Sequence, residues 1–262
     1  MSLRRAVFTL AVLASLAGCG DERSSSPDPP ATPTRTPTPS PQPPAGEPVT
    51  FRASDGVQLR GRSFGEGTSW VVLTHMAKQR STEENWLPLA RRLADAGYRA
   101  VVYNRRGVCA RDFDCSDGDD DPDEAWRDVV GAVRFARREG GAERVALVGA
   151  SHGAMASLYA VSKQRVDVEA LVAVAGVNRA LEPYMFTRAD LRHAGARSLF
   201  VAGDEDHNGA DAVAREWARW SGGELLLLES DQHGTQLLDD GQPTQAPLIE
   251  GTLAFLQRAF TS

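Results

Sequence analysis

The sequence predicts an α/β domain with a mostly parallel sheet that helices cover on both faces. Short, nearly continuous apolar runs, such as Trp70–Thr74 and Ala100–Tyr103, alternate with amphipathic segments such as Thr82–Ala96. Strands that are apolar on both faces belong to sheets buried between two layers of helices. A second observation is the apolar run from Arg144, which ends in Gly-x-Ser-x-Gly and leads directly into a small-residue helical stretch.

The expected elements alternate along the domain. Phe51 and Val57–Phe64 form an opening hairpin around the turn signal Asp55-Gly56, and Gly97 ends the first helix. The later elements are expected in this order: strand Trp70–Thr74, helix Thr82–Ala96, strand Ala100–Tyr103, helix Glu124–Arg138, strand Val145–Val148, helix His152–Lys163, strand Ala170–Ala175, an irregular stretch to Gly195, strand Ser198–Ala202, helix Ala210–Trp220, strand Glu224–Leu228 and a final helix near Leu248–Ala259.

The first residues are typical of an export signal. Arg4 and Arg5 precede an apolar run from Ala6 to Leu16, which is too short to span a bilayer comfortably. The run ends in Leu-Ala-Gly-Cys19, which resembles the processing site of bacterial lipoproteins. That resemblance implies that Cys19 becomes the first mature residue and carries a lipid that anchors the protein to the membrane. Ordinary secretion, with Cys19 removed or free, is the alternative.

The segment from Asp21 to Pro48 cannot form a core. It mixes prolines with Ser, Thr and Ala, a composition that favours extended polyproline II. We therefore expect a signal peptide at 1–18, a lipid-anchored Pro/Thr/Ser-rich linker at 19–48 and one α/β domain at 49–262. The domain is long enough for a sizeable core.

Charge and cysteine usage narrow the partners and the compartment. The formal net charge is −6 and no basic run follows the signal, which argues against a nucleic-acid partner. Of the three cysteines, Cys109 and Cys115 remain within the domain, close together in one loop. Outside the cytoplasm such a pair can form a local disulfide. Neither cysteine lies in a Gly-x-Ser-x-Gly context, so we do not expect a catalytic thiol.

The motif Gly149-Ala150-Ser151-His152-Gly153 has the strand–turn–helix context of a nucleophile elbow. Its glycines let strand and helix pass closely while the turn pushes the Ser151 hydroxyl out at the carboxyl edge of the sheet. A tight turn with a solvent-exposed serine is the alternative. With the serine after the fifth strand, the order of elements resembles the α/β-hydrolase family across essentially all of residues 49–262. The short connection from Val177 to Arg197 leaves room for only a minimal cap.

The resemblance also implies a catalytic triad. In this family the chain order is nucleophile, acid, histidine, with the acid after the seventh strand and the histidine after the eighth. The family pattern selects Asp206, three residues past Gly203, and His233, which precedes a glycine in the loop before the last helix. Ser151 would attack an acyl carbon, His233 would move the proton and Asp206 would orient the imidazole.

Other assignments of the acid stay open. Asp204 lies closer to the end of the strand, and Glu205 stands between the two aspartates. The acidic loop could also serve only to cap the helix that begins near Gly209, with Asp206 or Asn208 as the cap.

The oxyanion donors are expected at two backbone amides. One is His152, which follows the nucleophile at the start of a helix. The other follows the third strand, where the turn reads Thr74-His75-Met76-Ala77, and Ala77 is the first candidate with Met76 the second. Methionine stands where the family usually has glycine, so the loop must take a different path or accept Met76 in a permissive conformation. We expect His75 to brace this loop by hydrogen bonding.

Some residues have both a substrate-binding and a structural interpretation. Tyr184, Met185 and Phe186 would wall the substrate pocket with Met76, or would belong to the core. The His152 side chain is expected to pack beside the elbow. Seven aspartates crowd the loop that holds the cysteine pair, and oxygen-rich loops can bind Ca²⁺, which stays an alternative. Their spacing does not match an EF-hand, and acids also stabilise the start of the following helix without a metal. No metal and no cofactor are expected.

The sequence thus predicts an exported, lipid-anchored serine hydrolase that cleaves ester or related acyl bonds in a small-molecule acyl substrate. A serine peptidase or an acyltransferase would use the same triad. A non-catalytic surface-binding lipoprotein is the alternative from another class, and Met76 is its only support. The serine at the elbow excludes relatives with other nucleophiles, since dehalogenases and epoxide hydrolases of this fold need aspartate and dienelactone hydrolases use cysteine.

Overall fold

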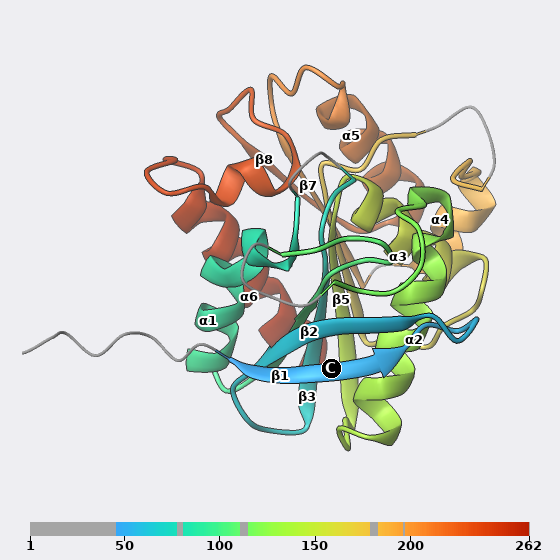
Figure 1. The fold of residues 1–262 in the computed structure, drawn as a ribbon. Coiled ribbons are helices and arrows are strands. Elements are labelled where there is room, and N and C mark those ends of the chain that lie inside the picture. The colour runs from blue at the N-terminus through green and yellow to red at the C-terminus, as the bar shows by residue number, and fades with distance from the viewer. Residues whose placement is uncertain (1–45, 78–80, 111–114, 179–182, 196, 262) are drawn as a thin grey trace, which may run out of the picture. The chain divides into compact units, whose positions relative to one another are not determined.

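A computed structural model of the chain describes residues 46–77, 81–110, 115–178, 183–195 and 197–261 (Figure 1). The predicted signal peptide, Cys19 and almost all of the predicted linker lie outside these residues. Strand β1 begins at Glu47, within the last two residues assigned to the linker. In the described ranges, no helix is both long and apolar enough to cross a membrane.

The core of the domain is one eight-stranded sheet with the order β1-β2-β4-β3-β5-β6-β7-β8. The strands β1 and β2 form the expected antiparallel hairpin, β2 pairs antiparallel with β4, and the remaining neighbours are parallel. The bounds are β1 Glu47–Arg52, β2 Gln58–Phe64, β3 Ser69–Thr74, β4 Arg99–Tyr103, β5 Arg144–Ala150, β6 Ala170–Val174, β7 Ser198–Gly203 and β8 Glu224–Leu228. The predicted mostly parallel sheet is confirmed.

Helices cover both faces of the sheet (Figure 1). The helices α1 and α6 contact each other on one face, and α2, α3, α4 and α5 follow one another in contact on the other. The α-helices are α1 Leu87–Asp95, α2 Ala125–Arg138, α3 His152–Ser162, α4 Arg188–Ala194, α5 Ala210–Ser221 and α6 Gln245–Thr261; short 3₁₀ turns are η1 Glu83–Trp86, η2 Pro122–Glu124 and η3 Gly234–Leu238.

Capping boxes set the start of two of these helical segments, η1 and α4. Thr82 and Asn85 form a capping box, so the segment predicted as one helix begins as the 3₁₀ turn η1 and continues as α1. Thr187 and Asp190 form a second box at α4. The prediction of an irregular stretch to Gly195 is therefore wrong at α4. This helix has only one buried residue, Leu191, so it lacks the apolar periodicity that reveals longer helices.

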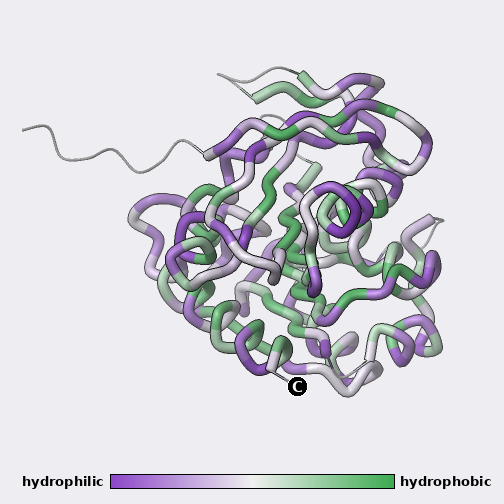
Figure 2. The backbone as a smooth tube through the Cα atoms, turned by 90° about the horizontal axis from the view of Figure 1, so that it is seen from below, coloured by the Kyte–Doolittle hydropathy of each residue, from purple (hydrophilic) through white to green (hydrophobic). Residues whose placement is uncertain are grey.

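The apolar pattern of the sequence follows the layers. Every residue of β6 and β7 is buried, as are all residues of β3 and β5 after the first. The smooth tube of Figure 2 is most hydrophobic along these central strands and most hydrophilic at the periphery. Strands with both faces buried match the near-continuous apolar runs of the sequence.

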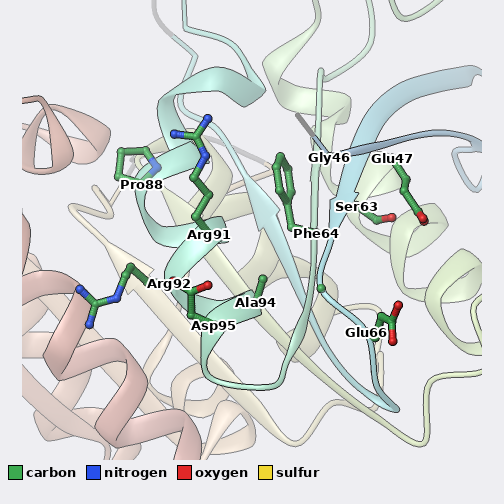
Figure 3. Close-up of a pocket in the computed structure, with 11 residues that line it drawn as sticks. Gly46, Glu47, Ser63, Phe64, Glu66, Pro88, Arg91, Arg92, Ala94 and Asp95 are labelled. Atoms are coloured by element: carbon green, nitrogen blue, oxygen red, sulfur yellow. The ribbon is translucent and has the colours of Figure 1, made fainter. Parts of the chain in front are cut away.

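A cavity of about 630 Å³ opens at the edge of the sheet where the parallel strands begin (Figure 3). Its lining comes from the start of β1, the end of β2 and helix α1, and includes Phe64, Pro88 and Arg91. Phe64 is opposite Ala100 near the start of β4. Functional residues of parallel sheets gather at the other edge, where the strands end. This cavity is therefore remote from the predicted nucleophile.

A buried ionic network that the sequence analysis did not anticipate joins three segments. The Arg106 guanidinium donates to the carboxylate of Asp128 in α2, with N–O distances of 2.9 and 2.7 Å. It also donates to the carboxylate of Asp55 in the β1–β2 turn, with distances of 2.9 and 3.2 Å. The network joins the turn of the hairpin to helix α2 through the Arg106 guanidinium. The charges are paired, and an unpaired buried charge would be strongly destabilising.

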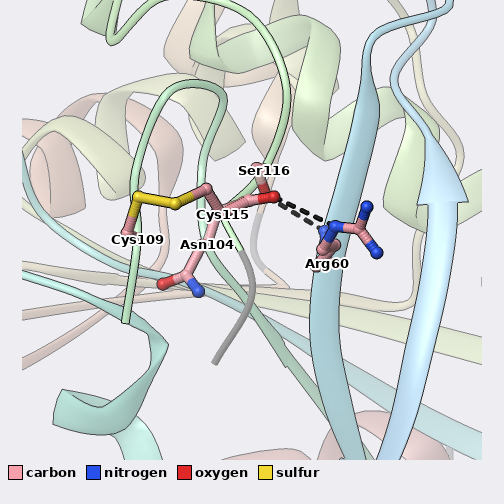
Figure 4. The surroundings of a disulfide bond; sticks show 5 residues. All are labelled: Arg60, Asn104, Cys109, Cys115 and Ser116. Carbon is pink, nitrogen blue, oxygen red and sulfur yellow. Dashed lines mark hydrogen bonds between the residues drawn. A yellow bond between two sulfur atoms is a disulfide. The ribbon is translucent and has the colours of Figure 1, made fainter. Parts of the chain in front are cut away.

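The expected disulfide joins Cys109 and Cys115 in the loop after β4 (Figure 4). The loop is also fastened by hydrogen bonds beside the bridge. Ser116 Oγ donates to the carbonyl of Asn104 at 2.7 Å and accepts the backbone N–H of Arg60 at 3.0 Å. The Arg60 side chain donates to the carbonyl of Cys115 at 3.0 Å. The bridge thus holds a loop that is tied to both β2 and β4.

We predict that the double variant Cys109→Ser/Cys115→Ser lowers the free energy of unfolding by about 2 kcal/mol, since the bridge closes only a short loop. Both cysteines are exposed, so serine buries no new polar group. Urea unfolding of the variant and of the unchanged protein, with and without a reductant, would measure the effect. Reductant should lower the stability of the unchanged protein alone. Equal free energies of unfolding of the variant and the unchanged protein without reductant would contradict the prediction.

Candidate active site

The Gly-x-Ser-x-Gly segment forms a tight strand–turn–helix junction between β5 and α3. Ser151 has φ 50° and ψ −114°, a backbone conformation that a residue with a side chain adopts only under strain. A Cβ atom on Gly149 would lie 2.2 Å from the carbonyl oxygen of Gly153, and one on Gly153 would lie 2.2 Å from that of Thr74. Both positions therefore require glycine. The predicted elbow geometry is present.

The structure brings Ser151, His233 and Asp206 together in a chain of two hydrogen bonds. His233 Nδ1 lies 2.7 Å from Asp206 Oδ2, and His233 Nε2 lies 2.8 Å from Ser151 Oγ. A carboxylate only accepts hydrogen bonds, so Nδ1 carries the proton and donates to Asp206. In the neutral ring Nε2 is then the acceptor for the Ser151 hydroxyl. The imidazole is in the tautomer that can take the serine proton.

Of the candidate acids, Asp206 is the one that meets the histidine. Its side chain is fully buried. Its second oxygen, Oδ1, accepts the backbone N–H of Asn208 at 2.8 Å, so the carboxylate is held on both sides. Asp204 instead accepts the backbone N–H of Ser230 at 3.0 Å, and Glu205 is exposed. Helix α5 begins after Gly209 without a side-chain cap, so Asp206 does not serve merely as its cap.

The loops that carry the acid and the histidine are fastened to each other by their backbones. Asp204 N–H donates to the carbonyl of Leu228 at 2.8 Å, and Glu205 N–H donates to that of Ser230 at 3.1 Å. A Cβ atom on Gly203 would lie 2.4 Å from the Ser230 carbonyl oxygen. A glycine at this position is what allows the two loops to approach closely enough to pair.

His75 braces the loop after β3, as expected. Its ring is fully buried, and Nε2 accepts the backbone N–H of Arg105 at 3.1 Å. Nδ1 therefore carries the hydrogen and donates to the carbonyl of Met76 at 3.0 Å. Burial, with the nearby positive charge of Arg105, lowers the pKa of His75 to about 3. The ring is a neutral structural link at neutral pH.

Met76 fits the loop without backbone strain. Among described residues other than glycine, positive φ angles occur at Ser151, Arg165 and Ala175, so Met76 has no left-handed backbone. Its side chain reaches Gly234, where a Cβ atom would lie 2.9 Å from the Met76 sulfur. Met76, which stands where the family usually has glycine, is thus accommodated because Gly234, beside His233, has no side chain. Met76 therefore does not use the permissive conformation that the sequence left as one alternative.

A cavity of about 360 Å³ lies over the Ser151 hydroxyl. It brings together the predicted oxyanion residues Ala77 and His152, the predicted wall residue Met76 and the nucleophile with its histidine. Sequence reasoning missed three further lining residues, Val177, Asn208 and Gln236. For two of them the sequence offered one clue, which is their short distance along the chain from the triad. Asn208 is two residues past Asp206, and Gln236 is three past His233. Nothing in the sequence indicated that they line the cavity at the nucleophile.

The aromatic segment expected to wall the pocket packs elsewhere. Tyr184 is fully buried, and its hydroxyl donates to the carbonyl of Pro122 at 2.9 Å. Phe186 is buried edge-to-face against Trp217, and Met185 is 41% exposed. None of these three lines the described cavity, and Tyr184 and Phe186 take the core position that the sequence left open. Large aromatic rings gain more from the core between α3 and α5 than from a small polar cavity.

His152 packs beside the elbow, as expected, and also lies at the cavity. Its ring meets Tyr184 edge-to-face, with the ring centres 6.4 Å apart, so it packs beside the elbow. It also lines the cavity. His152 therefore lies between the aromatic core and the cavity at Ser151.

The aspartate-rich loop has local structural roles. Asp121 accepts the backbone N–H of Asp123 at 3.0 Å at the start of η2, and Asp120 pairs with the buried Arg105 at 3.0 Å. Asp112 and Asp114 lie outside the described residues. In the part of the chain that is described, no group of three or more His, Cys, Asp or Glu side chains is placed to hold a metal ion.

Comparisons with known proteins agree with this architecture. A family model described as alpha/beta hydrolase fold matches residues 81–202. Among solved structures, an esterase from Pyrococcus furiosus has a TM-score of 0.64 at 15% identity, covering 81% of this chain and 92% of its own. The enzyme Est1E from Butyrivibrio proteoclasticus, solved with ferulic acid, has a TM-score of 0.62 at 12% identity, covering 82% of this chain and 100% of its own. DcsB, solved with a substrate analogue, has a TM-score of 0.64 at 16% identity, with coverages of 82% and 100%.

No curated protein matches this chain in sequence. At these low identities the structural neighbours establish the fold. The chain has the α/β-hydrolase fold, with helices on both faces of its sheet and, in the described part of the connection between β6 and β7, the one short helix α4.

We predict that His75 makes the stability of the protein fall in mild acid. The unfolded ring has its ordinary pKa near 6.5, and the folded ring titrates near 3. Between these values the unfolded chain binds a proton that the folded protein does not. The stability contributed at neutral pH is therefore lost as the pH falls from 6.5 toward 3, by at most about 1.4 kcal/mol per pH unit.

Urea unfolding at pH 7 and pH 5 would measure this loss in the unchanged protein and in His75→Asn. The loss should be smaller by about 2 kcal/mol in the variant, which lacks the titrating ring. His193→Asn, at an exposed position on α4, is the matched control and should keep the loss of the unchanged protein. Equal losses in all three proteins would contradict a neutral buried His75.

Proposed function

From the α/β-hydrolase fold of this chain, we propose that it is a serine hydrolase that cleaves ester bonds in a small-molecule acyl substrate. One observation carries the proposal. The Ser151 hydroxyl, the His233 ring and the Asp206 carboxylate form a continuous hydrogen-bonded chain that opens onto a cavity. A serine hydroxyl is a weak nucleophile until an oriented base can accept its proton.

In the first half of the reaction, Ser151 Oγ bonds to the carbonyl carbon as its proton passes to His233 Nε2. The carbonyl oxygen becomes an oxyanion in a tetrahedral intermediate. When the carbon–oxygen bond to the alcohol breaks, the leaving oxygen takes the proton from His233. Asp206 stays a carboxylate and stabilises the imidazolium that exists between the two transfers. The products of this half are a free alcohol and an acyl group on Ser151.

In the second half, water takes the place of the alcohol. His233 accepts a proton from the water as its oxygen attacks the acyl carbon, and returns that proton to Ser151 Oγ as the acyl–serine bond breaks. The acid product leaves and the serine hydroxyl is restored. An acyltransferase would differ only in the acceptor that replaces water, and a serine peptidase in the leaving group.

The oxyanion would be stabilised by backbone amides at the cavity. The amide of His152 begins helix α3, where the helix dipole favours negative charge. The amide of Ala77 is the second donor, on the loop that His75 braces. Donors of this kind stabilise the transition state more than the ground state because the charge develops only during the reaction.

We predict that Ser151→Ala abolishes hydrolysis of p-nitrophenyl butyrate and labelling by a fluorophosphonate probe. Asp206→Asn should lower kcat by about 10⁴-fold, because the amide favours the wrong histidine tautomer. Asp204→Asn is the matched control, since its side-chain oxygen can still accept the Ser230 N–H and activity should change little. Full activity of Ser151→Ala would refute the mechanism, and an unlabelled Ser151 in the unchanged protein would favour a binding module.

We also propose that the protein is exported and anchored by a lipid on Cys19, with the domain outside the cytoplasm. The support is the signal-like run before Cys19 and the pair Cys109–Cys115, because disulfides persist in oxidising compartments. Bacteria that express the chain and are fed labelled palmitate should incorporate the label. Cys19→Ser should abolish incorporation and release the protein from the membrane fraction. Membrane retention of unlabelled Cys19→Ser would contradict this anchor.

A further inference from the structure

The cavity over Ser151 offers two kinds of contact. Met76, Ala77 and Val177 of its lining carry apolar side chains, and Asn208 and Gln236 of its lining carry carboxamides. Each carboxamide has two N–H donors and an acceptor oxygen, so it can bind either partner of a hydrogen bond. The site is therefore equipped to recognise a polar group close to the reacting carbon.

Both carboxamides are available to a substrate. In the described residues, the Asn208 and Gln236 side chains make no hydrogen bond to another protein group. Asn208 is exposed and Gln236 is half-buried, so water holds these positions until a ligand replaces it. A polar ligand group would restore the hydrogen bonds that the displaced water had made, whereas an alkyl group would not.

The backbone of each of the two residues is also held at a fixed place relative to the triad. The backbone N–H of Asn208 donates to Asp206 Oδ1 at 2.8 Å. The backbone N–H of Gln236 donates to the carbonyl of His233 at 3.2 Å, at the start of the 3₁₀ turn η3. The two side chains therefore start from backbones anchored to the acid and the base, and the polar group that they bind must lie near the reacting carbon.

The size and charge of the cavity limit the substrate further. Its volume of about 360 Å³ is near the lower end of the range for ligand pockets, roughly 300–1,000 Å³. No Asp, Glu, Lys or Arg belongs to its described lining. A long alkyl chain would extend into water, and an ionised group would find no opposite charge among the lining residues that the structure describes.

We propose that the preferred substrates are short, uncharged esters with a hydroxyl or amide group near the scissile carbonyl, which Asn208 and Gln236 bind. This inference rests on the proposed hydrolase function and adds the substrate class and two specificity-determining residues.

The test compares two esters of equal chain length, p-nitrophenyl butyrate and p-nitrophenyl 3-hydroxybutyrate. Each kcat/KM is divided by the rate of uncatalysed hydrolysis of the same ester, which removes the difference in intrinsic reactivity. The unchanged protein should prefer the hydroxylated ester by about tenfold, the effect of one hydrogen bond in a partly exposed site. The octanoate ester should be a poorer substrate than the butyrate.

Variants assign this preference to the two carboxamides. Gln236→Met and Asn208→Leu remove the hydrogen-bonding groups and nearly keep the side-chain size, so each should lower the preference and the double variant should bring it close to one. Gln257→Met is the matched control, because Gln257 is exposed on α6 and does not line the cavity. It should keep both the activity and the preference of the unchanged protein.

Labelling by the fluorophosphonate probe separates the two levels of the proposal. If Ser151 is labelled and butyrate is hydrolysed, but the preference is absent or survives in the double variant, the substrate class is overturned and the hydrolase function stands. If Ser151 is not labelled and neither ester is hydrolysed, the function fails and the substrate class fails with it.

Discussion

The site depends on backbone contacts too close for any side chain to lie between them. The loops after β7 and β8 pair through their backbones because Gly203 presents no Cβ to the Ser230 carbonyl. The turn after β5 packs against the end of β3 for the same reason, at Gly153. Parallel strands bring their ends to one edge, and these contacts convert that proximity into hydrogen-bond distances of 2.7 and 2.8 Å at His233. Backbone geometry therefore sets the positions of the catalytic atoms.

A second set of contacts reaches the site from the disulfide loop. Ser116, next to Cys115, donates to the carbonyl of Asn104, and the following residue, Arg105, donates its N–H to His75. His75 in turn holds the Met76 carbonyl, beside the proposed oxyanion donor. Because the buried ring stays neutral at neutral pH, this path transmits position and adds no charge. The disulfide loop thus helps to hold the proposed oxyanion side of the cavity.

The sequence was most informative where function and backbone geometry impose the same residue. Gly149 and Gly153 are required by contacts at 2.2 Å, so the motif predicted the elbow before any coordinates. The order of strands then predicted which loops carry Asp206 and His233. The choice between Asp206 and Asp204 rested on resemblance alone, since each follows β7 and each is anionic. The structure separates them because only Asp206 turns inward, with its other oxygen bound by an Asn208 N–H.

Side-chain direction was where sequence reasoning was weakest. For Tyr184 and Phe186, in the irregular connection, the sequence left both a pocket wall and a core position open, and their rings join the core. Asn208 and Gln236 were missed because polar residues in loops usually face water and carry no periodic signal. Helix α4 was missed because its amphipathic face is a single buried leucine. All of these outcomes depend on packing partners far away in the chain, which the local sequence does not reveal.

The triad and the cavity lining are held by different parts of the structure, and this affects how the site can change. The strained backbone of Ser151 costs on the order of 1–3 kcal/mol and persists because the packing of β3, β5 and α3 leaves no other path. The backbone that positions the triad is therefore fixed by the packing of the sheet and its helices. Met76, Asn208 and Gln236 instead meet the cavity through side chains on loops, where substitution changes the lining and leaves those backbone contacts in place. Selectivity in this fold can thus vary at positions that the catalytic geometry does not constrain.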